Sequence, residues 1–449
     1  MVRAPAPTTT RRARIAGSRV RAALAPLLLA PAIAQAWDVD WALGLGLEYS
    51  DNIARVPEGE TSDFIVVPRG ELAIREHGTR VQLDAVGSAE FRHYVDGTFD
   101  DELRAELAAR ANFVISPERF SWTVEDYLAQ EPIDIFAADR PDNTQLVNVF
   151  LTGPTARFRL APATALQAEL RYVDTWAEET DAFDGYRHVG ALRFMREASE
   201  ISRYSINAEA QRARFDAPSV AAPDYDRFDT YFRYEREGAR LQRAGEIGWT
   251  WIEYDRSDDI SGLRALAEAT WALSSVSTLD AALASQYTDS AQDLILQQPA
   301  TSLGRPLPLT DARRTTVTAD VFEERRLELG YARQGDRTYF RVGGFHREQD
   351  YETIDALDVR SRGATFDIAY RVSARQTISG FAFHERRDYS TVDRDDRDRV
   401  FGVRWRLHWL ERVWLGAEIA HTARDSSDPL QEFDELRALL TLTLSRDGA

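Results

Sequence analysis

The chain has 449 residues, a formal net charge of −18, no cysteine and 44% hydrophobic residues. A water-soluble protein of this length usually divides into two or three domains, and no change of composition marks such a division. No apolar run reaches the roughly 20 residues that a membrane-spanning helix needs. The acidic balance argues against nucleic-acid binding, because phosphate would be repelled. The absence of cysteine suits an oxidising periplasm.

The first 36 residues have the organisation of a secretory signal peptide. An acid-free basic segment is followed by a short apolar core at residues 22–33, which contains Pro26 and Pro31. The core ends at Ala34-Gln35-Ala36, which matches an A-x-A cleavage site. We therefore expect Sec-type export and removal of residues 1–36, so that residues 37–449 form the mature protein.

The mature chain begins with strict alternation of apolar and small or polar residues, and the pattern returns to the end of the chain. Trp41, Leu43, Leu45, Leu47 and Tyr49 form the first apolar set. Successive side chains of a strand point to opposite faces, so each segment predicts a strand with one apolar face. These strands are about ten to fourteen residues long, whereas strands of globular sheets usually have about five or six. Charged residues on the second face fit a water-filled lumen better than the core of a soluble β-sandwich, which is the alternative.

The connections between the predicted strands alternate in length. Short turns are expected near residues 76–78, 116–118, 161–163, 237–238, 274–275, 335–336, 373–374 and 411–412. Longer, mostly acidic loops are expected at residues 51–62, 131–145, 216–226 and 289–312. This predicts an all-β, antiparallel up-and-down transmembrane barrel of about 20 strands, with 18 as the alternative count and both termini in the periplasm. Residues 314–333 are left open as one strand or a hairpin.

Two kinds of residue add detail to this barrel. Aromatic residues near strand ends predict belts at the membrane interfaces: Trp37, Tyr94, Trp122, Trp176, Tyr186, Trp249, Trp251, Tyr254, Trp409 and Trp414. Pro68 and Pro154 fall inside predicted strands. Because proline has no N–H to donate, we expect bulges or strand ends at both positions.

The inward face of the predicted strands carries many charges. The candidate lumen-lining residues are Arg80, Arg92, Arg104, Arg110, Arg171, Arg404, Arg406, Glu48, Glu90, Glu106, Glu125, Glu169 and Tyr127. Rings of charge set pore selectivity, and arginine pairs well with the carboxylates of an acidic polymer. Tyr127 would stack on a sugar ring. The alternative is that Arg and Glu pair with one another across neighbouring strands and stabilise the wall.

No constellation of an enzyme or a metal site stands out. The sequence lacks H-E-x-x-H, G-x-S-x-G and P-loop motifs, and its seven histidines are scattered. A hydrolase site that uses His188 or His408 is the less favoured alternative. Residues 393–398 alternate Asp and Arg, and we expect a solvated surface loop there, because the arginines would compete with calcium. We predict no catalytic residue, no metal and no cofactor.

A short segment is repeated within the chain. Residues 345–351 (FHREQDY) resemble residues 383–389 (FHERRDY). The offset is about one hairpin with its loop, so we interpret the repeat as the hairpin period and not as a duplicated site.

Several short motifs resemble a known family. The end of the first strand, Tyr49-Ser50-Asp51-Asn52-Ile53, is similar to the opening hairpin of outer-membrane β-barrel porins associated with exopolysaccharide and PEP-CTERM (exosortase) gene clusters. Asn143 with Gly153-Pro154, residues 321–329 and residues 347–351 are similar as well. The resemblance implies an outer-membrane barrel tied to polysaccharide export. Its expected partners are outer-membrane lipid, polysaccharide and periplasmic export components, and no residue role carries over.

From these patterns we predict an outer-membrane channel that takes part in exopolysaccharide export by passive guidance through a charged lumen. A general porin for small solutes is the alternative, followed by a barrel enzyme or a structural outer-membrane protein. No separate plug domain is visible, but the loop at residues 289–312 is the candidate for an inward segment that narrows the pore.

Overall fold

The computed structural model describes residues 37–218, 223–297 and 316–446. The predicted signal peptide, residues 1–36, lies outside the described residues. Within the described ranges, no helix is both long and apolar enough to cross a membrane.

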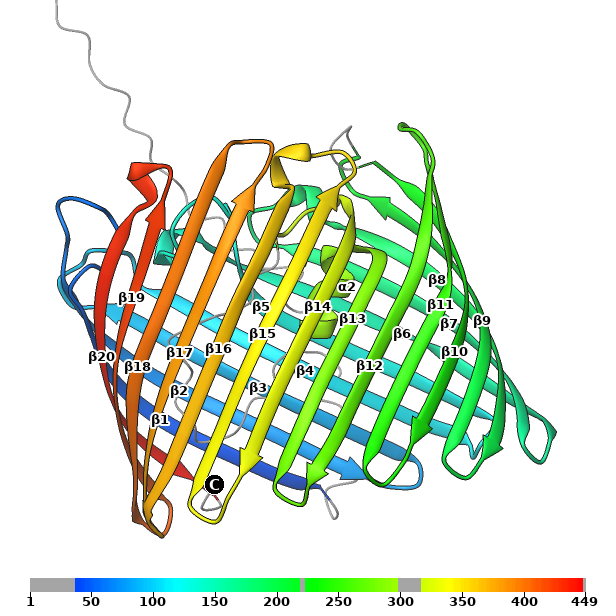
Figure 1. The fold of residues 1–449 in the computed structure, drawn as a ribbon, viewed down its shortest axis with the longest axis horizontal. Helices are drawn as coiled ribbons and strands as arrows, with labels where there is room; N and C mark the ends of the chain where they lie inside the picture. The colour runs from blue at the N-terminus through cyan, green and yellow to red at the C-terminus, as the bar shows by residue number, and fades with distance from the viewer. Residues whose placement is uncertain (1–36, 219–222, 298–315, 447–449) are drawn as a thin grey trace, which may run out of the picture. The chain divides into compact units, whose positions relative to one another are not determined.

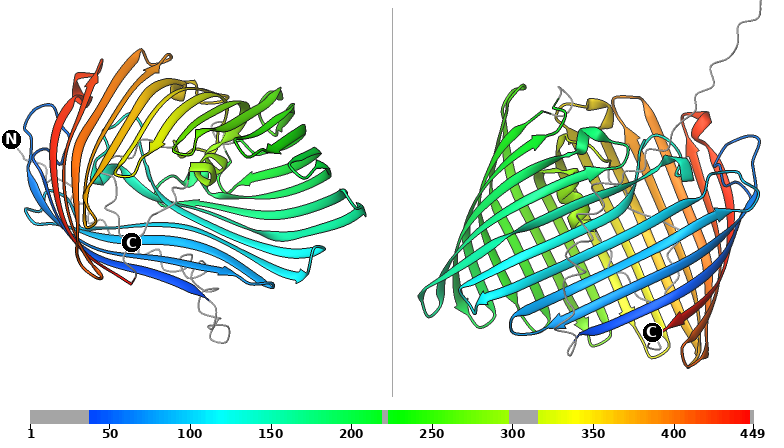
Figure 2. Two further views of the ribbon diagram at one scale, coloured as in Figure 1. Left: turned by 60° about the horizontal axis from the view of Figure 1, so that its bottom comes forward. Right: turned by 180° about the vertical axis from the view of Figure 1, so that it is seen from behind.

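Twenty strands form one antiparallel sheet that closes on itself (Figures 1 and 2). Their bounds are β1 (Asp38–Ser50), β2 (Asp63–His77), β3 (Val81–Tyr94), β4 (Glu102–Ser116), β5 (Phe120–Pro132), β6 (Thr144–Ala161), β7 (Thr164–Ala177), β8 (Gly185–Ser199), β9 (Ser202–Phe215), β10 (Tyr225–Glu237), β11 (Leu241–Tyr254), β12 (Ile260–Ser274), β13 (Ser277–Asp289), β14 (Val321–Gln334), β15 (Thr338–Tyr351), β16 (Val359–Ser373), β17 (Gln376–Tyr389), β18 (Arg394–Leu410), β19 (Val413–Ser426) and β20 (Phe433–Ser445).

The ring closes where the first strand meets the last. β1 pairs with β20 from Ala42 opposite Ser445 to Ser50 opposite Arg437. A closed ring leaves no unpaired strand edge, which is the condition for a sheet to cross hydrocarbon. The predicted count of 20 strands is confirmed. The strands contain 13 to 18 residues, so most lie within the predicted length of about ten to fourteen, and β2, β4, β6, β8, β12, β16 and β18 exceed it.

Alternation along each strand separates an apolar outer face from a polar interior. In β1, Leu43 is 56% exposed, whereas Glu48 in the same strand is 2% exposed and pairs inside the ring. Every strand from β1 to β20 presents at least one exposed Leu, Ile, Val or aromatic side chain of this kind. Such a surface is stable against lipid and not against water. The chain is therefore an outer-membrane β-barrel.

The predicted alternation of short and long connections is confirmed. Each predicted short turn lies between two consecutive strands, and a further short turn, missed in the sequence, joins β8 to β9 at Glu200. Residues 314–333 do not form a hairpin, because a single strand, β14, begins at Val321. Residues 314 and 315 lie outside the described residues.

The expected bulge or strand end at Pro68 and Pro154 is wrong. Both prolines lie inside long strands, and the register continues unshifted on either side of them. Around Pro154, the β6–β7 pairing omits only Gly153 and Pro154. The Arg171 guanidinium donates to the Pro154 carbonyl at 2.8 Å and to the Leu170 carbonyl at 2.8 Å. The inward Arg171 side chain thus supplies donors to two backbone carbonyls at the point where proline has no N–H to donate to the sheet ladder.

The aromatic belt is confirmed only in part. Trp122, Trp249 and Trp409 are exposed on the outer face. Tyr94 and Tyr254 are buried instead, because strand alternation turns them inward. The Tyr94 hydroxyl donates to Glu102 at 2.5 Å, so its polar tip is paired inside the barrel and not at the lipid interface.

Replacement of Gly153 by alanine is expected to destabilise the barrel. Its φ is +159°, and an added Cβ would lie 2.0 Å from the Leu170 carbonyl oxygen, which is backbone and cannot turn aside. We expect a loss of about 1–3 kcal/mol in the free energy of unfolding, measured by urea unfolding in detergent micelles. Gly190→Ala is the matched control, since its Cβ would meet only the Leu170 Cδ2 atom at 3.5 Å. Equal midpoints for the two variants would contradict this account.

Candidate functional site: a charged lumen crossed by two segments

The predicted lumen residues of the first strands pair with one another. Glu48 accepts a hydrogen bond from Arg92 at 2.9 Å and another from Arg437. Arg92 also lies 3.4 Å from Glu90. Arg104 pairs with Glu102 at 2.8 Å. Arg92, Arg104, Glu90 and Glu106 line one hollow on the interior of the wall.

Most of the remaining predicted residues also make local contacts. Arg110 lies 3.2 Å from Glu125, which also accepts from the Tyr127 hydroxyl at 3.1 Å. Further pairs join Arg171 to Glu169 at 3.6 Å and Arg404 to Glu418. The Arg406 guanidinium lies over the Trp414 ring, 5.9 Å from its centroid. Arg80 lies in the turn before β3, outside the strands of the wall.

The Arg110–Glu125, Arg404–Glu418 and Glu48 pairs are the cross-strand pairing that the sequence analysis gave as the alternative to a free ring of charge, and the other pairs join residues two apart on one strand. Pairs of this kind stabilise the wall. A role for these residues in selectivity stays a prediction.

A short helix crosses the interior of the barrel. α2 (Ser290–Gln297) follows β13 and lies inside the ring of strands (Figures 1 and 2). Asp289 caps its first turn by accepting from the backbone N–H groups of Ala291 and Gln292 at 3.0 and 3.2 Å. The same carboxylate forms an ion pair with Arg187 of β8 at 2.7 Å. One buried aspartate thus fixes the start of the helix and ties it to another wall.

The two sides of α2 contact strands that lie far apart in the sheet. Ala291 and Leu294 pack in an apolar cluster with residues of β6 and β7, including Val149 and Val173. On the opposite side, Asp293 forms an ion pair with Arg347 of β15 at 2.8 Å. The helix therefore bridges two walls of the barrel. The predicted inward loop is confirmed for residues 290–297, and residues 298–315 lie outside the described residues.

The β5–β6 connection, residues 133–143, forms a second crossing. Phe136 lies against Tyr389 of β17, with ring centroids 5.2 Å apart. The Ala137 carbonyl accepts from Arg424 of β19 at 3.4 Å, and the Asp139 carbonyl accepts from Arg55 at 2.7 Å. The loop therefore reaches β17 and β19, which lie far from β5 around the ring.

Asn143 holds this loop in shape. Its amide donates to the carbonyls of Asp134 and Ala138 at 2.8 and 3.1 Å, and its side-chain oxygen accepts from the Asp134 N–H at 2.9 Å. The side chain is buried, and its three hydrogen bonds satisfy backbone groups that lie outside the sheet ladder. Asn143 is one of the residues that carry the family resemblance, and these hydrogen bonds give it a structural role.

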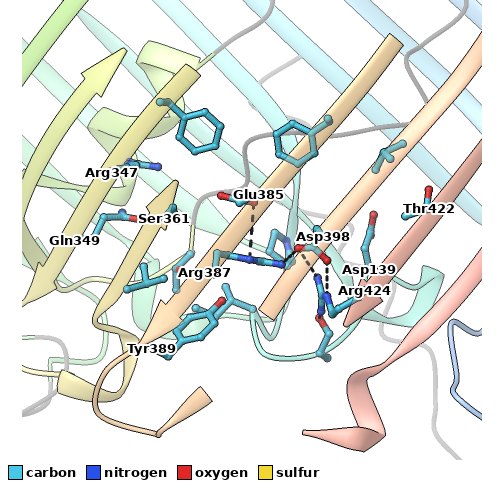
Figure 3. A pocket seen from close by; sticks show the side chains of 18 of the residues that line it. Asp139, Arg347, Gln349, Ser361, Glu385, Arg387, Tyr389, Asp398, Thr422 and Arg424 are labelled. Atoms are coloured by element: carbon cyan, nitrogen blue, oxygen red, sulfur yellow. Dashed lines mark hydrogen bonds and ion pairs between the residues drawn. The ribbon is translucent and has the colours of Figure 1, made fainter. Parts of the chain in front are cut away.

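Between the crossing loop and the β14–β20 wall lies a charged cavity, which we call the lumen site (Figure 3). Asp398 of β18 is its centre. It accepts from Arg424 at 2.7 Å and from Arg387 of β17. Arg387 also lies 3.8 Å from Glu385. The expectation of a solvated loop at residues 393–398 is wrong, because β18 begins at Arg394 and turns Asp396 and Asp398 inward.

A pair of aromatic rings forms the apolar part of the lumen site. Phe345 of β15 and Phe383 of β17 stack with a centroid distance of 6.4 Å and an interplanar angle of 12°. The intervening strand carries Gly363, where an added Cβ would lie 2.6 Å from the Phe345 ring. Absence of a side chain at this position therefore leaves room for the Phe345 ring beside Phe383.

Sequence reasoning missed the lumen site. Asp398 lies in a run whose composition predicts a loop, and Arg424 lies in no motif. Phe345 and Phe383 are the first residues of the repeated segment, so the repeat contains the signal that places them at equivalent heights. Among the described residues, no group of three or more His, Asp or Glu side chains could hold a metal ion.

Comparisons with known proteins give no family. No family model matches the sequence, and no curated protein matches it. Similar solved structures include the FrpB iron transporter from Neisseria meningitidis, 9% identical with a TM-score of 0.46, covering 90% of this chain and 81% of that one. A mutant of the ferric enterobactin receptor PfeA from Pseudomonas aeruginosa is 9% identical with a TM-score of 0.47, covering 91% and 80%. The outer membrane protein opdK from the same organism is 13% identical with a TM-score of 0.40, covering 91% and 99%. These scores are too low to carry a functional inference.

Removal of the α2 crossing is expected to widen the pore. A variant in which a short Gly-Ser linker replaces residues 290–315 should show higher single-channel conductance in planar bilayers, because α2 bridges two walls of the lumen. The same linker in place of residues 427–432 is the control, since Leu430 in that loop is 77% exposed. Unchanged conductance in the α2 variant would show that the helix does not restrict the conducting path.

Proposed function

We propose that this barrel is the outer-membrane passage for an exopolysaccharide. The observation that carries the proposal is the Phe345–Phe383 stack beside the Arg387–Asp398–Arg424 network in the lumen site. The C–H face of a pyranose ring is apolar and packs on an aromatic ring, while its hydroxyls need donors and acceptors around the rim. The lumen site offers both. The sequence resemblance to barrels of exopolysaccharide gene clusters supports the same function.

The arginine–aspartate ion pairs of the lumen site suit a polymer that is transported better than a ligand that is held tightly. Arg387 and Arg424 already have a carboxylate partner in Asp398. An acidic sugar would exchange one carboxylate for another, so it would gain little net free energy. Conduction requires sites that bind weakly enough to release. We infer that the polymer moves along a wall of exchangeable contacts.

The two crossings give the channel a resting state of reduced width. α2 is held by the Asp293–Arg347 ion pair and by apolar packing, and the β5–β6 loop is held by Arg55, Arg424 and Tyr389. Passage of a saccharide chain would require at least one crossing to move aside. The general porin remains the second candidate, and the charged lining described above is compatible with it.

The first test is a clean deletion of this gene beside the complemented strain. Loss of surface and secreted polysaccharide with accumulation in the periplasm is the expected result, because the barrel would be the outer-membrane step of export. Unchanged polysaccharide outside the cell would remove this proposal and leave the general porin, to be pursued by solute uptake.

The second test addresses the aromatic pair. Complementation with Phe345→Ala/Phe383→Ala should lower polysaccharide export and weaken binding of a matching oligosaccharide about tenfold, equivalent to about 1.4 kcal/mol. Export is measured as secreted sugar, and binding by titration calorimetry with the purified barrel. Phe366→Ala is the control, because this phenylalanine of β16 faces outward and is 42% exposed. Equal export by the double variant and the control would contradict a role for the stack.

A further inference from the structure

A cluster of arginines faces outward from β16, β17 and β18. Arg362 lies directly opposite Arg386, and Arg386 lies directly opposite Arg397. With Arg399 they line one shallow hollow on the wall. They alternate along their strands with interior residues such as Arg387 and Asp398, so they point away from the lumen. We call Arg362, Arg386, Arg397 and Arg399 the outward arginine cluster.

Carboxylates balance only part of the charge of this cluster. Asp395 contacts both Arg386, at 2.6 Å, and Arg397, at 3.3 Å. Asp425 contacts Arg399 at 2.7 Å. Arg362 forms no ion pair with any residue that the structure describes. Four guanidinium groups therefore face two carboxylates.

The nearest other acidic residues of the outer face lie one row closer to the long loops, beside Arg360. Glu348 contacts Arg360 at 2.9 Å, and Asp388 lies opposite Arg360 in the sheet. On the other side of the cluster His384 and His346 lie opposite Arg399 and Arg362, and they add no negative charge. Like charges directly opposite one another destabilise a sheet. Within the described chain, the row of three opposed arginines therefore has Asp395 as its one carboxylate partner, and two positive charges of the row stay unbalanced.

The height of the cluster on the wall indicates where a further anion for these arginines comes from. Arg362, Arg386 and Arg397 each lie three residues from the loop end of their strands, at Val359, Tyr389 and Arg394. At about 3.3 Å per residue this is about 10 Å. Toward the turns, the outer face becomes apolar, with Phe366, Phe401 and Val403 exposed. The cluster thus lies at the border of the lipid-facing band, where headgroups are expected.

We propose that the outward arginine cluster binds the phosphate groups of a phosphorylated glycolipid of the outer leaflet. Planar guanidinium groups bind phosphate through paired hydrogen bonds, and phosphate would supply the missing negative charge. The fixed row on three adjacent strands presents several guanidinium groups to one headgroup. This inference rests on the outer-membrane location, with the long loops facing outward, and not on the transported substrate.

The test measures binding of diphosphoryl lipid A to the purified mature barrel in mixed micelles by native mass spectrometry. Arg362→Ala/Arg386→Ala/Arg397→Ala should raise the dissociation constant about tenfold or more. The corresponding triple lysine variant keeps the charge but loses the paired geometry, so we expect an intermediate value, and it serves if the alanine variant fails to fold. Arg212→Ala/Arg214→Ala is the control, because these outward arginines of β9 share Asp226 at 2.9 and 3.0 Å.

Three results would overturn the proposal. The first is equal lipid A binding by the wild type and both triple variants. The second is equal binding of dephosphorylated lipid A by the wild type, which would remove phosphate as the recognised group. The third is full displacement of lipid A by an equal concentration of inorganic phosphate, which would assign the site to free phosphate. A loss confined to the triple variants, with phosphate-dependent binding and no such displacement, would support it.

Discussion

The β1–β20 pairing is the interaction on which the rest of the structure depends. Hydrocarbon offers no partner for backbone N–H and C=O groups, so a sheet can cross a membrane only as a closed ring. Closure joins residues about 400 positions apart in sequence, such as Leu43 and Leu444. Once the ring is closed, strand alternation fixes which side chains face lipid and which face the lumen. Every feature of the interior follows from that division.

The interior must accommodate many charges within a limited space. Arginine and carboxylate side chains pair across strands, as Glu48 does with Arg92 and Arg437. Buried charges without a partner are costly, so local pairing is the stable arrangement. The crossings use the same chemistry: Asp289 and Asp293 of the α2 region meet Arg187 and Arg347 of distant walls. Ion pairs that hold such segments can be exchanged for others, whereas the sheet ladder cannot.

Sequence patterns predict the parts of this protein that depend on period and composition. The strand count, the alternation of turns and loops and the inward position of residues 290–297 follow from them, whereas the helix that these residues form does not. What the sequence could not show depends on contacts between distant residues. Asp398 looks like part of a polar loop until β18 turns it toward Arg424. Pro154 looks like a strand breaker until Arg171 supplies hydrogen bonds to the carbonyls around it. Tyr94 looks like an interface residue until strand alternation places it inside.

The central functional claim is that a saccharide chain enters this lumen. The most direct measurement is the ionic current through the purified wild-type barrel in a planar bilayer, before and after addition of an acidic oligosaccharide to one side. The account predicts discrete, reversible interruptions of the current whose frequency rises with oligosaccharide concentration, because each entering chain would occupy the space between the crossings and the wall. A steady current that the oligosaccharide does not alter would contradict it.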